Sequence, residues 1–373
     1  MRNVRSAQVT KVLGAVLIIV AAFGACRKDD PESPTPEPPG TGPTSPVVFD
    51  INAVPYAQLS TYNFFQGPMA DQQPSYGVLP FEPISTLFTD YAKKKRFVWM
   101  PSGVKAQYAA DGALLDFADG TVLIKNFYYD NVQPGGDRRI IETRLMFRRN
   151  GAWEFADYVW NAEQTEATFD LVGSNTAVEW VDDNSVARSI DYRIPSHAEC
   201  ATCHKSYSQP VPIGTKPQNL NGDFAYEDGS MNQLAKWELM GYLESGFPSG
   251  INTVVDYHDV TQDLEMRVRS YVDINCAHCH ADGGHCDYRP MRFAFGATID
   301  PVNLGVCVEP DDPIDPSQTH IVSRGNTARS MMYYRINSND EAVRMPLFGR
   351  TIIHEEAVDM IGEWIDGLSP PCP

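Results

Sequence analysis

The sequence predicts an α+β chain of several domains, in which a β-rich N-terminal sandwich or barrel precedes two smaller segments, the last one mostly α-helical. Three observations support this division. Apolar and charged residues alternate along the middle of the chain, apolar residues near the C-terminus recur at helical spacing, and the pattern C-x-x-C-H occurs twice. We therefore expect a signal peptide, a Pro-rich stalk, a β-rich domain and two C-x-x-C-H segments, with the bounds 1–25, 26–46, 47–195, 196–258 and 259–373.

The N-terminus has the features of a bacterial lipoprotein signal. Arg2, Arg5 and Lys11 form a basic region, and the apolar stretch Val12 to Ala25 that follows is short for a membrane span. Small residues before Cys26 indicate cleavage and lipid attachment at that cysteine, and an ordinary signal peptide is the alternative. The lipid reading predicts a protein anchored in the bacterial outer membrane, at the cell surface or on the periplasmic face.

The residues after the signal resemble an extended spacer. Seven prolines fall between positions 31 and 46, a composition that favours polyproline II over a packed core.

The formal charge of −18 argues against binding to nucleic acid. One basic run, Lys93 to Arg96, interrupts this acidity, and we interpret it as a solvated turn beside a strand in preference to a docking patch.

The predicted β-rich domain contains three clear strands. Residues 121–128 are rich in β-branched and aromatic side chains, and residues 141–148 alternate between apolar and charged. Asn150-Gly151 is typical of a tight turn and leads into an aromatic run at 153–160, so we expect a hairpin. No cluster of His and Cys and no phosphate-binding loop occurs here, so no role is predicted for this domain.

The C-terminal segment has the outline of a small helical domain. Apolar residues at 264, 268, 271 and 272 predict a helix that leads into Cys276, and those at 358, 361, 365 and 368 predict a final helix. Glu355 and Glu356 fall in the first turn of that last helix, where its dipole favours negative charge. We expect these two helices to pack across each other. The first C-x-x-C-H lies between Pro195 and Pro210 and is predicted to be mostly loop, with one clear helix at 232–243.

The two C-x-x-C-H runs carry the chemistry. This pattern is the attachment signature of a c-type haem, because two thiols three residues apart reach both porphyrin vinyl groups and the next residue is a proximal iron ligand. The sequence thus predicts two haem c groups, with thioether bonds and proximal ligands from Cys200, Cys203, Cys276, Cys279, His204 and His280. Zinc and a redox disulfide are the alternatives. Zinc ribbons place their pairs closer together, and a redox disulfide needs no following His.

A distal iron ligand for the second haem is predicted at Met345. It precedes Pro346, which excludes helix and leaves a loop that can present a thioether. A core-filling role is the alternative, with Met331 and Met332 as substitute ligands. For the first haem, Met231 is the candidate distal ligand and His258 is an alternative. A third possibility is an iron with an open coordination position.

Three cysteines are left over. In an oxidising compartment Cys286, Cys307 and Cys372 allow three pairings, and a bond to Cys372 would fix the C-terminus. His278 and His285 flank the second motif, where either a tuning role or a plain surface position fits.

With these motifs in place, the chain resembles an uncharacterised family of di-haem c-type cytochrome lipoproteins, often found beside parallel β-helix repeat proteins. The resemblance rests on both C-x-x-C-H motifs and on residues 141–145, 192–195, 304–307, 345–346, 354–356 and 364–365. It implies a β-rich domain followed by two haem segments, and it implies no reaction.

Three functions compete. We expect an extracytoplasmic electron carrier that works with unknown redox partner proteins and has no catalytic residues. A peroxidase-like di-haem enzyme with one open iron is an alternative, although such enzymes usually separate their motifs by a whole domain. A haem-bearing binding or sensing module is the third.

Overall fold

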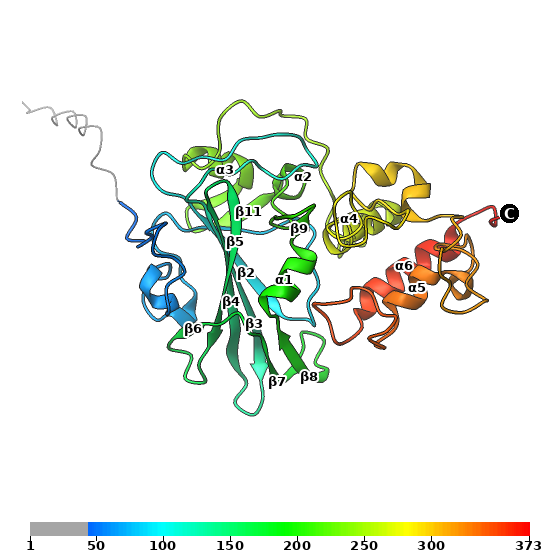
Figure 1. The fold of residues 1–373 in the computed structure, drawn as a ribbon, viewed down its shortest axis with the longest axis horizontal. Coiled ribbons are helices and arrows are strands. Elements are labelled where there is room, and N and C mark those ends of the chain that lie inside the picture. The colour runs from blue at the N-terminus through cyan, green and yellow to red at the C-terminus, as the bar shows by residue number, and fades with distance from the viewer. Residues whose placement is uncertain (1–43) are drawn as a thin grey trace, which may run out of the picture. The chain divides into compact units, whose positions relative to one another are not determined.

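An eight-stranded antiparallel sheet dominates the part of the chain that the structure describes, residues 44–373 (Figure 1). The structure is a computed structural model, and these residues form one compact unit. The predicted signal peptide, Cys26 and most of the stalk lie outside the described residues. Six strands follow in chain order as β1 to β6, with the bounds Leu79–Phe81, Lys93–Trp99, Val122–Val132, Asp137–Arg149, Ala152–Trp160 and Ala167–Phe169.

A second hairpin joins this sheet at one end. It consists of β7, Ser174–Val181, and β8, Ala187–Ile194, and it attaches through the pair Val132 and Trp180. The prediction of a β-rich, antiparallel N-terminal region is therefore confirmed. Its strands form one connected sheet, so the described residues do not build the two separate sheets of a sandwich.

The predicted strands and their turn are confirmed. The runs at 121–128, 141–148 and 153–160 lie in β3, β4 and β5. Asn150 and Gly151 both have positive φ, 53° and 76°, as a two-residue hairpin turn with the twist of the strands requires. The interpretation of Lys93 to Arg96 as a turn is wrong. These residues form the first half of β2 and pair with β3, so their side chains alternate between the two faces of the sheet; of the four, only Arg96 is buried.

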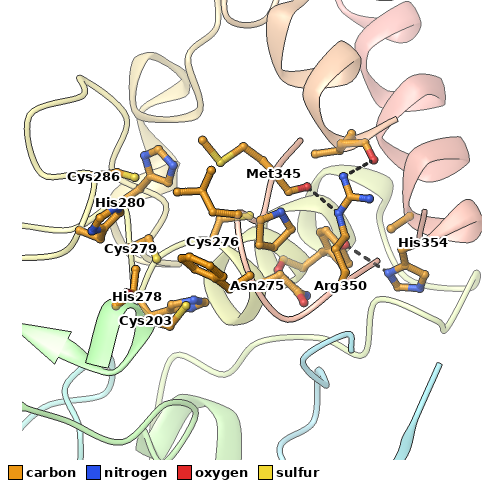
Figure 2. A pocket seen from close by; sticks show the side chains of 18 of the residues that line it. Cys203, Asn275, Cys276, His278, Cys279, His280, Cys286, Met345, Arg350 and His354 are labelled. Atoms are coloured by element: carbon orange, nitrogen blue, oxygen red, sulfur yellow. Dashed lines mark hydrogen bonds between the residues drawn. The ribbon is translucent and has the colours of Figure 1, made fainter. Parts of the chain in front are cut away.

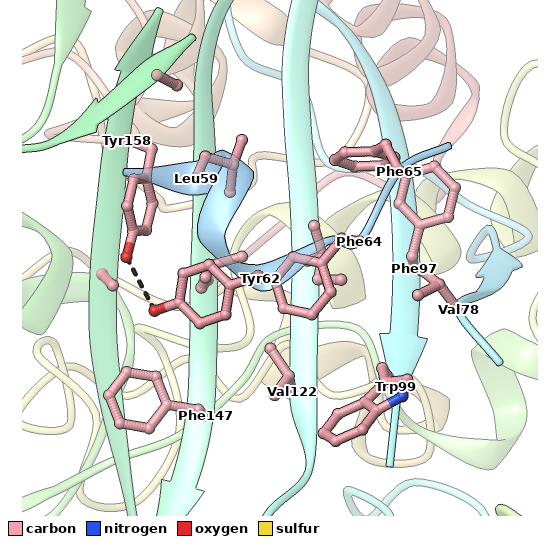
Figure 3. Packing of buried hydrophobic residues seen from close by; sticks show 14 of the residues in the cluster. Leu59, Tyr62, Phe64, Phe65, Val78, Phe97, Trp99, Val122, Phe147 and Tyr158 are labelled. Carbon is pink, nitrogen blue, oxygen red and sulfur yellow. Dashed lines mark hydrogen bonds between the residues drawn. The ribbon is translucent and has the colours of Figure 1, made fainter. Parts of the chain in front are cut away.

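One face of the sheet packs against the N-terminal segment of the unit. Two short 3-10 helices, η1 at Leu59–Tyr62 and η2 at Met69–Asp71, cross this face. Tyr62 and Phe64 stack at 4.8 Å and lie over buried strand residues that include Phe147 and Trp99 (Figure 3). The hydroxyls of Tyr62 and Tyr158 lie 2.9 Å apart, so these two buried polar groups are hydrogen-bonded to each other.

The other face of the sheet packs against the first C-x-x-C-H segment. This segment contains three helices, α1 to α3, at His197–Cys203, Pro217–Leu220 and Gln233–Leu239. Two small hairpins lie between them, with strands β9 to β12 at Lys205–Ser206, Gln209–Pro210, Asp223–Tyr226 and Gly229–Asn232. Trp237 of α3 is fully buried against Phe81 and Phe117, and Cys200 packs into the same cluster. The first segment therefore shares a hydrophobic core with the sheet.

The helix α1 was not predicted. Its N-terminus is a capping box, in which Ser196 accepts from the backbone of Glu199 and the Glu199 carboxylate accepts from the backbone of Ser196. Arg193 donates to the same carboxylate through Nε and Nη2, at 3.1 and 2.7 Å. The predicted helix at 232–243 is shorter than expected, because Gly241, with φ 76°, ends the helical turn that begins at Asn232.

Replacing Glu199 with Gln should destabilise the protein by about 1 kcal/mol at pH 7, since capping-box and partly exposed ion-pair contributions are of that size. The Arg193 guanidinium lowers the pKa of Glu199 to about 2 in the folded protein. A depressed pKa contributes stability above the unfolded-state pKa, roughly 4.3, and loses it as the pH falls towards 2. Urea unfolding at pH 7 and pH 3 should therefore show the difference shrinking. Glu163→Gln, at an exposed turn position, is the control and should leave the free energy of unfolding unchanged at both pH 7 and pH 3.

The C-terminal segment is helical, as predicted. It contains α4, α5 and α6 at Leu264–Asn275, Met331–Ile336 and Glu355–Gly367, with 3-10 turns η3 to η5 at Ala297–Ile299, Pro301–Leu304 and Thr327–Arg329. Val268 and Val272 of α4 share one buried cluster with Ile361 and Ile365 of α6. The predicted packing of the two helices across each other is confirmed. No helix among residues 44–373 has both the length and the apolar character to cross a membrane.

A disulfide joins Cys307 to Cys372 and leaves Cys286 buried with a free thiol. Of the three pairings that the sequence allowed, this one ties the C-terminus to the turn after η4. We expect the double replacement of Cys307 and Cys372 by Ala to lower the free energy of unfolding by about 2–4 kcal/mol, because the bond closes a long loop in the unfolded chain. Urea titration checks this value. Cys286→Ala, which breaks no bond, is the control and should cost less.

Candidate functional site

The two C-x-x-C-H motifs meet at one cavity. Cys203 from the first motif lines it together with Cys276, Cys279 and His280 from the second (Figure 2). Met345 lines the same cavity from the loop between α5 and α6. The structure thus brings together four of the six motif residues with the predicted distal ligand of the second haem, although these residues are far apart in sequence.

The closest approach between the motifs involves three side chains. The Sγ atoms of Cys203 and Cys279 and a ring nitrogen of His278 all lie within 4.8 Å of one another. Hydrogen bonds from Cys279 and His278 lower the pKa of the Cys203 thiol to about 5, and the same contact raises the pKa of Cys279. The two thiols therefore share a proton in preference to ionising together.

The first motif is held on α1. Cys200 and Cys203 lie one helical turn apart, and Cys200 packs against the sheet, where burial raises its pKa to about 11. His204 is the C-cap of this helix and donates a hydrogen bond from Nδ1 to the carbonyl of Val211, at 3.0 Å. That bond fixes the tautomer and leaves Nε2 with a free electron pair, which is the arrangement of a metal-binding imidazole.

The second motif follows directly after α4. Cys276 is the C-cap of that helix, and its carbonyl accepts from the backbone of Cys279 at 3.1 Å and of His280 at 3.0 Å. A single tight turn therefore carries both thiols and the imidazole. The ring of His280 packs edge-on against Phe293 at 5.1 Å. Its Nδ1 is buried without a hydrogen-bond partner among the described residues, unlike the Nδ1 of His204.

Both motif histidines are neutral at physiological pH. Burial lowers the pKa of His204 to about 3 and that of His280 to about 4. Only the neutral imidazole has an electron pair to give to a metal ion, so desolvation prepares both rings to act as ligands.

The loop that presents Met345 is fixed by one buried arginine. Arg350 is 3% exposed, and its Nε donates to the carbonyl of Met345 at 2.9 Å. Its Nη2 donates to the carbonyls of Arg335 and Ser338, at 3.2 and 2.8 Å. Met345 also donates its own N–H to the carbonyl of Arg335 at 3.0 Å. The backbone of Met345 is thereby held beside the second motif.

His354 also lines the cavity, although the sequence predicted no place for it in the site. Its ring stacks on Phe88 at 4.0 Å, and its Nδ1 lies 3.2 Å from the hydroxyl of Tyr271. It is 6% exposed, and burial lowers its pKa to about 3. Its contact with Phe88 joins residues that are far apart in the sequence, so no local pattern predicts it.

The other candidate ligands lie elsewhere. Met231 is on β12, opposite Phe224, with an exposed side chain that does not line the cavity. His258 is paired with Asp256 at 2.9 Å. Met331 and Met332 pack against the helical core. Met345 is therefore the one methionine in the lining of this cavity.

The donor set fits haem c better than zinc. Zinc in a structural site takes four ligands and would use both thiols of each pair. The convergent group here contains only the second cysteine of each motif together with His278. By contrast, each motif separately offers two thiols and one neutral imidazole on a single turn, and His204 has its Nε2 free for an iron ion.

Comparison with known proteins finds no matching family model, no matching curated sequence and no matching solved structure.

Proposed function

We propose that this protein is a di-haem c-type cytochrome lipoprotein that transfers electrons outside the cytoplasm, attached to the outer membrane through Cys26. The observation that supports it most is the contact between Cys203 and Cys279, whose sulfurs lie within 4.8 Å of each other. Each of these sulfurs is a predicted thioether anchor. Two redox groups attached at these sulfurs would lie close to each other, and a short distance between centres is what a relay requires.

Each motif contributes residues with separate tasks. Cys200 and Cys203 anchor one haem and Cys276 and Cys279 the other, while His204 and His280 bind iron from the proximal side. A haem bound at each motif supplies a one-electron centre. Val211 orients His204 through its carbonyl, and Arg350 holds the backbone of Met345, whose thioether would be the further ligand of the second haem. The last segment would then be a small cytochrome c domain, as its helix packing suggests.

A second candidate function has one observation in its favour. The cavity lining offers no second methionine, and Met231 points to solvent, so the first site lacks a thioether from the predicted set. An iron with an open position there would suit a redox enzyme or a sensor. Binding of carbon monoxide separates the two cases, since it requires an open or weakly held position.

The decisive experiment measures haem content and ligation. The full chain, made in a host that matures c-type haem, should give a pyridine haemochrome value of two haems per chain. A reduced low-spin spectrum that carbon monoxide leaves unchanged supports a carrier, and a shift in about half of the absorbance supports the enzyme or sensor. Bound zinc without haem would contradict the proposal.

Paired substitutions locate the two haems. The double variant C200A/C203A should retain one haem per chain, and so should C276A/C279A. Cys286→Ala is the matched control, because Cys286 lines the same cavity but belongs to neither motif. It should retain both haems. Two covalent haems in either double variant would show that the anchors are assigned wrongly.

A further inference from the structure

A row of charged side chains crosses the sheet on the face that carries the first motif. Arg96, Lys125, Arg144 and Asp157 lie directly opposite one another on β2, β3, β4 and β5. Residues two positions apart on a strand share a face, so Lys94 and Glu142 lie on this side as well. The row separates two apolar clusters, one around Phe155 and the other around Phe127.

Positive charge in this row exceeds the negative charge that neutralises it. Glu142 is fully buried and takes a double hydrogen bond from Arg144, at 2.8 and 2.5 Å, and Arg96 pairs with Glu82 at 3.1 Å. Neither Lys94 nor Lys125 has an ion pair with any described residue. Asp157 is 2% exposed and both of its oxygens lack a partner. Burial raises its pKa well above the usual range, so it supplies no charge at neutral pH.

The two lysines that have no ion pair both lie beside the Phe127 ring, and Nζ of Lys94 also donates to the carbonyl of Ala92 at 2.7 Å. The Nζ atoms of Lys94 and Lys125 lie 6.0 and 4.9 Å from the centre of the Phe127 ring, and the Arg144 guanidinium lies 4.2 Å from it. Desolvation lowers the pKa of Lys94 to about 7 and that of Lys125 well below its ordinary value. Positive charge on all three groups is unfavourable in this poorly solvated place, and an anion between them would offset that cost and favour the charged form of both lysines.

This cluster borders the first motif. Phe155 lies on the same face, and its ring is 5.6 Å from the ring of His204 and 5.5 Å from that of His197. Phe155 is two residues from Asp157 on β5, and Asp157 lies opposite Arg144, which lies opposite Lys125, so the charged row begins next to the ring that contacts His204. Anions at this position would be held beside the predicted proximal ligand.

We propose that Lys94 and Lys125 bind the propionate carboxylates of the haem attached at Cys200 and Cys203. This inference rests on the proposed function. A haem carries two ionised propionates, which match the two cations without an ion pair. This face of the sheet would then neutralise the propionate charges and orient the first haem. Arg144 is held in place by Glu142, which in turn accepts a hydrogen bond of 2.6 Å from the Tyr192 hydroxyl.

The test uses the intact holoprotein with its haem propionate carboxyls labelled with ¹³C through 5-aminolevulinic acid. The isotope-sensitive carboxylate bands of the redox-difference infrared spectrum should shift in Lys94→Met and in Lys125→Met. The midpoint potential of one haem should fall, because a positive charge near an oxidised centre favours its reduction. The control is Lys95→Met: Lys95 lies between Lys94 and Arg96 on β2 and faces the opposite side of the sheet.

The inference is overturned if Lys94→Met and Lys125→Met both give the same labelled carboxylate bands and the same midpoint potentials as the control Lys95→Met. Lys125→Arg keeps the charge and should retain the potential of the wild type, which separates a charge effect from a packing defect. Should Lys125→Met fail to fold, Lys94→Met carries the same test. A preparation without covalent haem refutes the proposed function itself, and a preparation with two haems but unmoved bands refutes only the propionate assignment.

Discussion

Replacing Met345 with Ala should convert one of the two proposed haems to a high-spin form that binds carbon monoxide. Met345 is the single methionine that lines the cavity beside Cys276 and His280, and Arg350 holds its backbone there. Loss of the thioether leaves the distal position to water. The midpoint potential of that haem should fall by on the order of 100 mV, because axial thioether ligation raises the potential of a haem.

Two further variants make this result specific. Met345→Leu keeps most of the side-chain volume without the sulfur, so it should show the same spin change with a smaller loss of stability. Met332→Leu alters a methionine that packs against the helical core and should leave the spectrum unchanged. A low-spin spectrum in Met345→Ala that is indifferent to carbon monoxide would remove Met345 from the set of ligands.

The parts of the site that the sequence predicts are local. Each C-x-x-C-H spacing places two thiols and an imidazole on one turn, and the alternation at 141–148 defines the two faces of β4. The helix α1 had a visible signal as well, since Ser196 and Glu199 form the S-x-x-E pattern of a capping box. Pro195 and Pro210 on either side favour loop, but the capping box starts a helix between them.

The contacts between segments had no such signal. The approach of Cys203 to Cys279 depends on how the first segment packs on the sheet and against the second motif, which no local pattern records. The same holds for the crowded cations on the sheet. The basic run at 93–96 is evident in the sequence, but Lys125 and Arg144 join it only through the register of β2, β3 and β4.

Replacing Asp90 with Ala should have the largest effect on stability of the changes considered, about 3–5 kcal/mol. Asp90 precedes β2 and is 2% exposed. Its carboxylate accepts from the backbone N–H groups of Thr351 and Ile352, at 2.6 and 3.1 Å, and from the Thr351 hydroxyl at 3.1 Å. Removing it leaves these donors buried without an acceptor, and each unmet charge-assisted bond costs about 1–3 kcal/mol.

This change should also reach the site, because residues 351 and 352 continue the loop that carries Met345 and Arg350. A loop released from Asp90 has more freedom, so we expect a larger fraction of the proposed second haem to bind carbon monoxide in Asp90→Ala than in the wild type. Asp90→Asn retains one acceptor oxygen, so its stability and its carbon monoxide binding should both lie between those of the wild type and of Asp90→Ala. Urea unfolding and carbon monoxide titration test the two effects independently. If Asp90→Ala unfolds at the same urea concentration as the wild type, the carboxylate does not hold the loop; a stability loss without increased carbon monoxide binding would mean that Arg350 alone positions Met345.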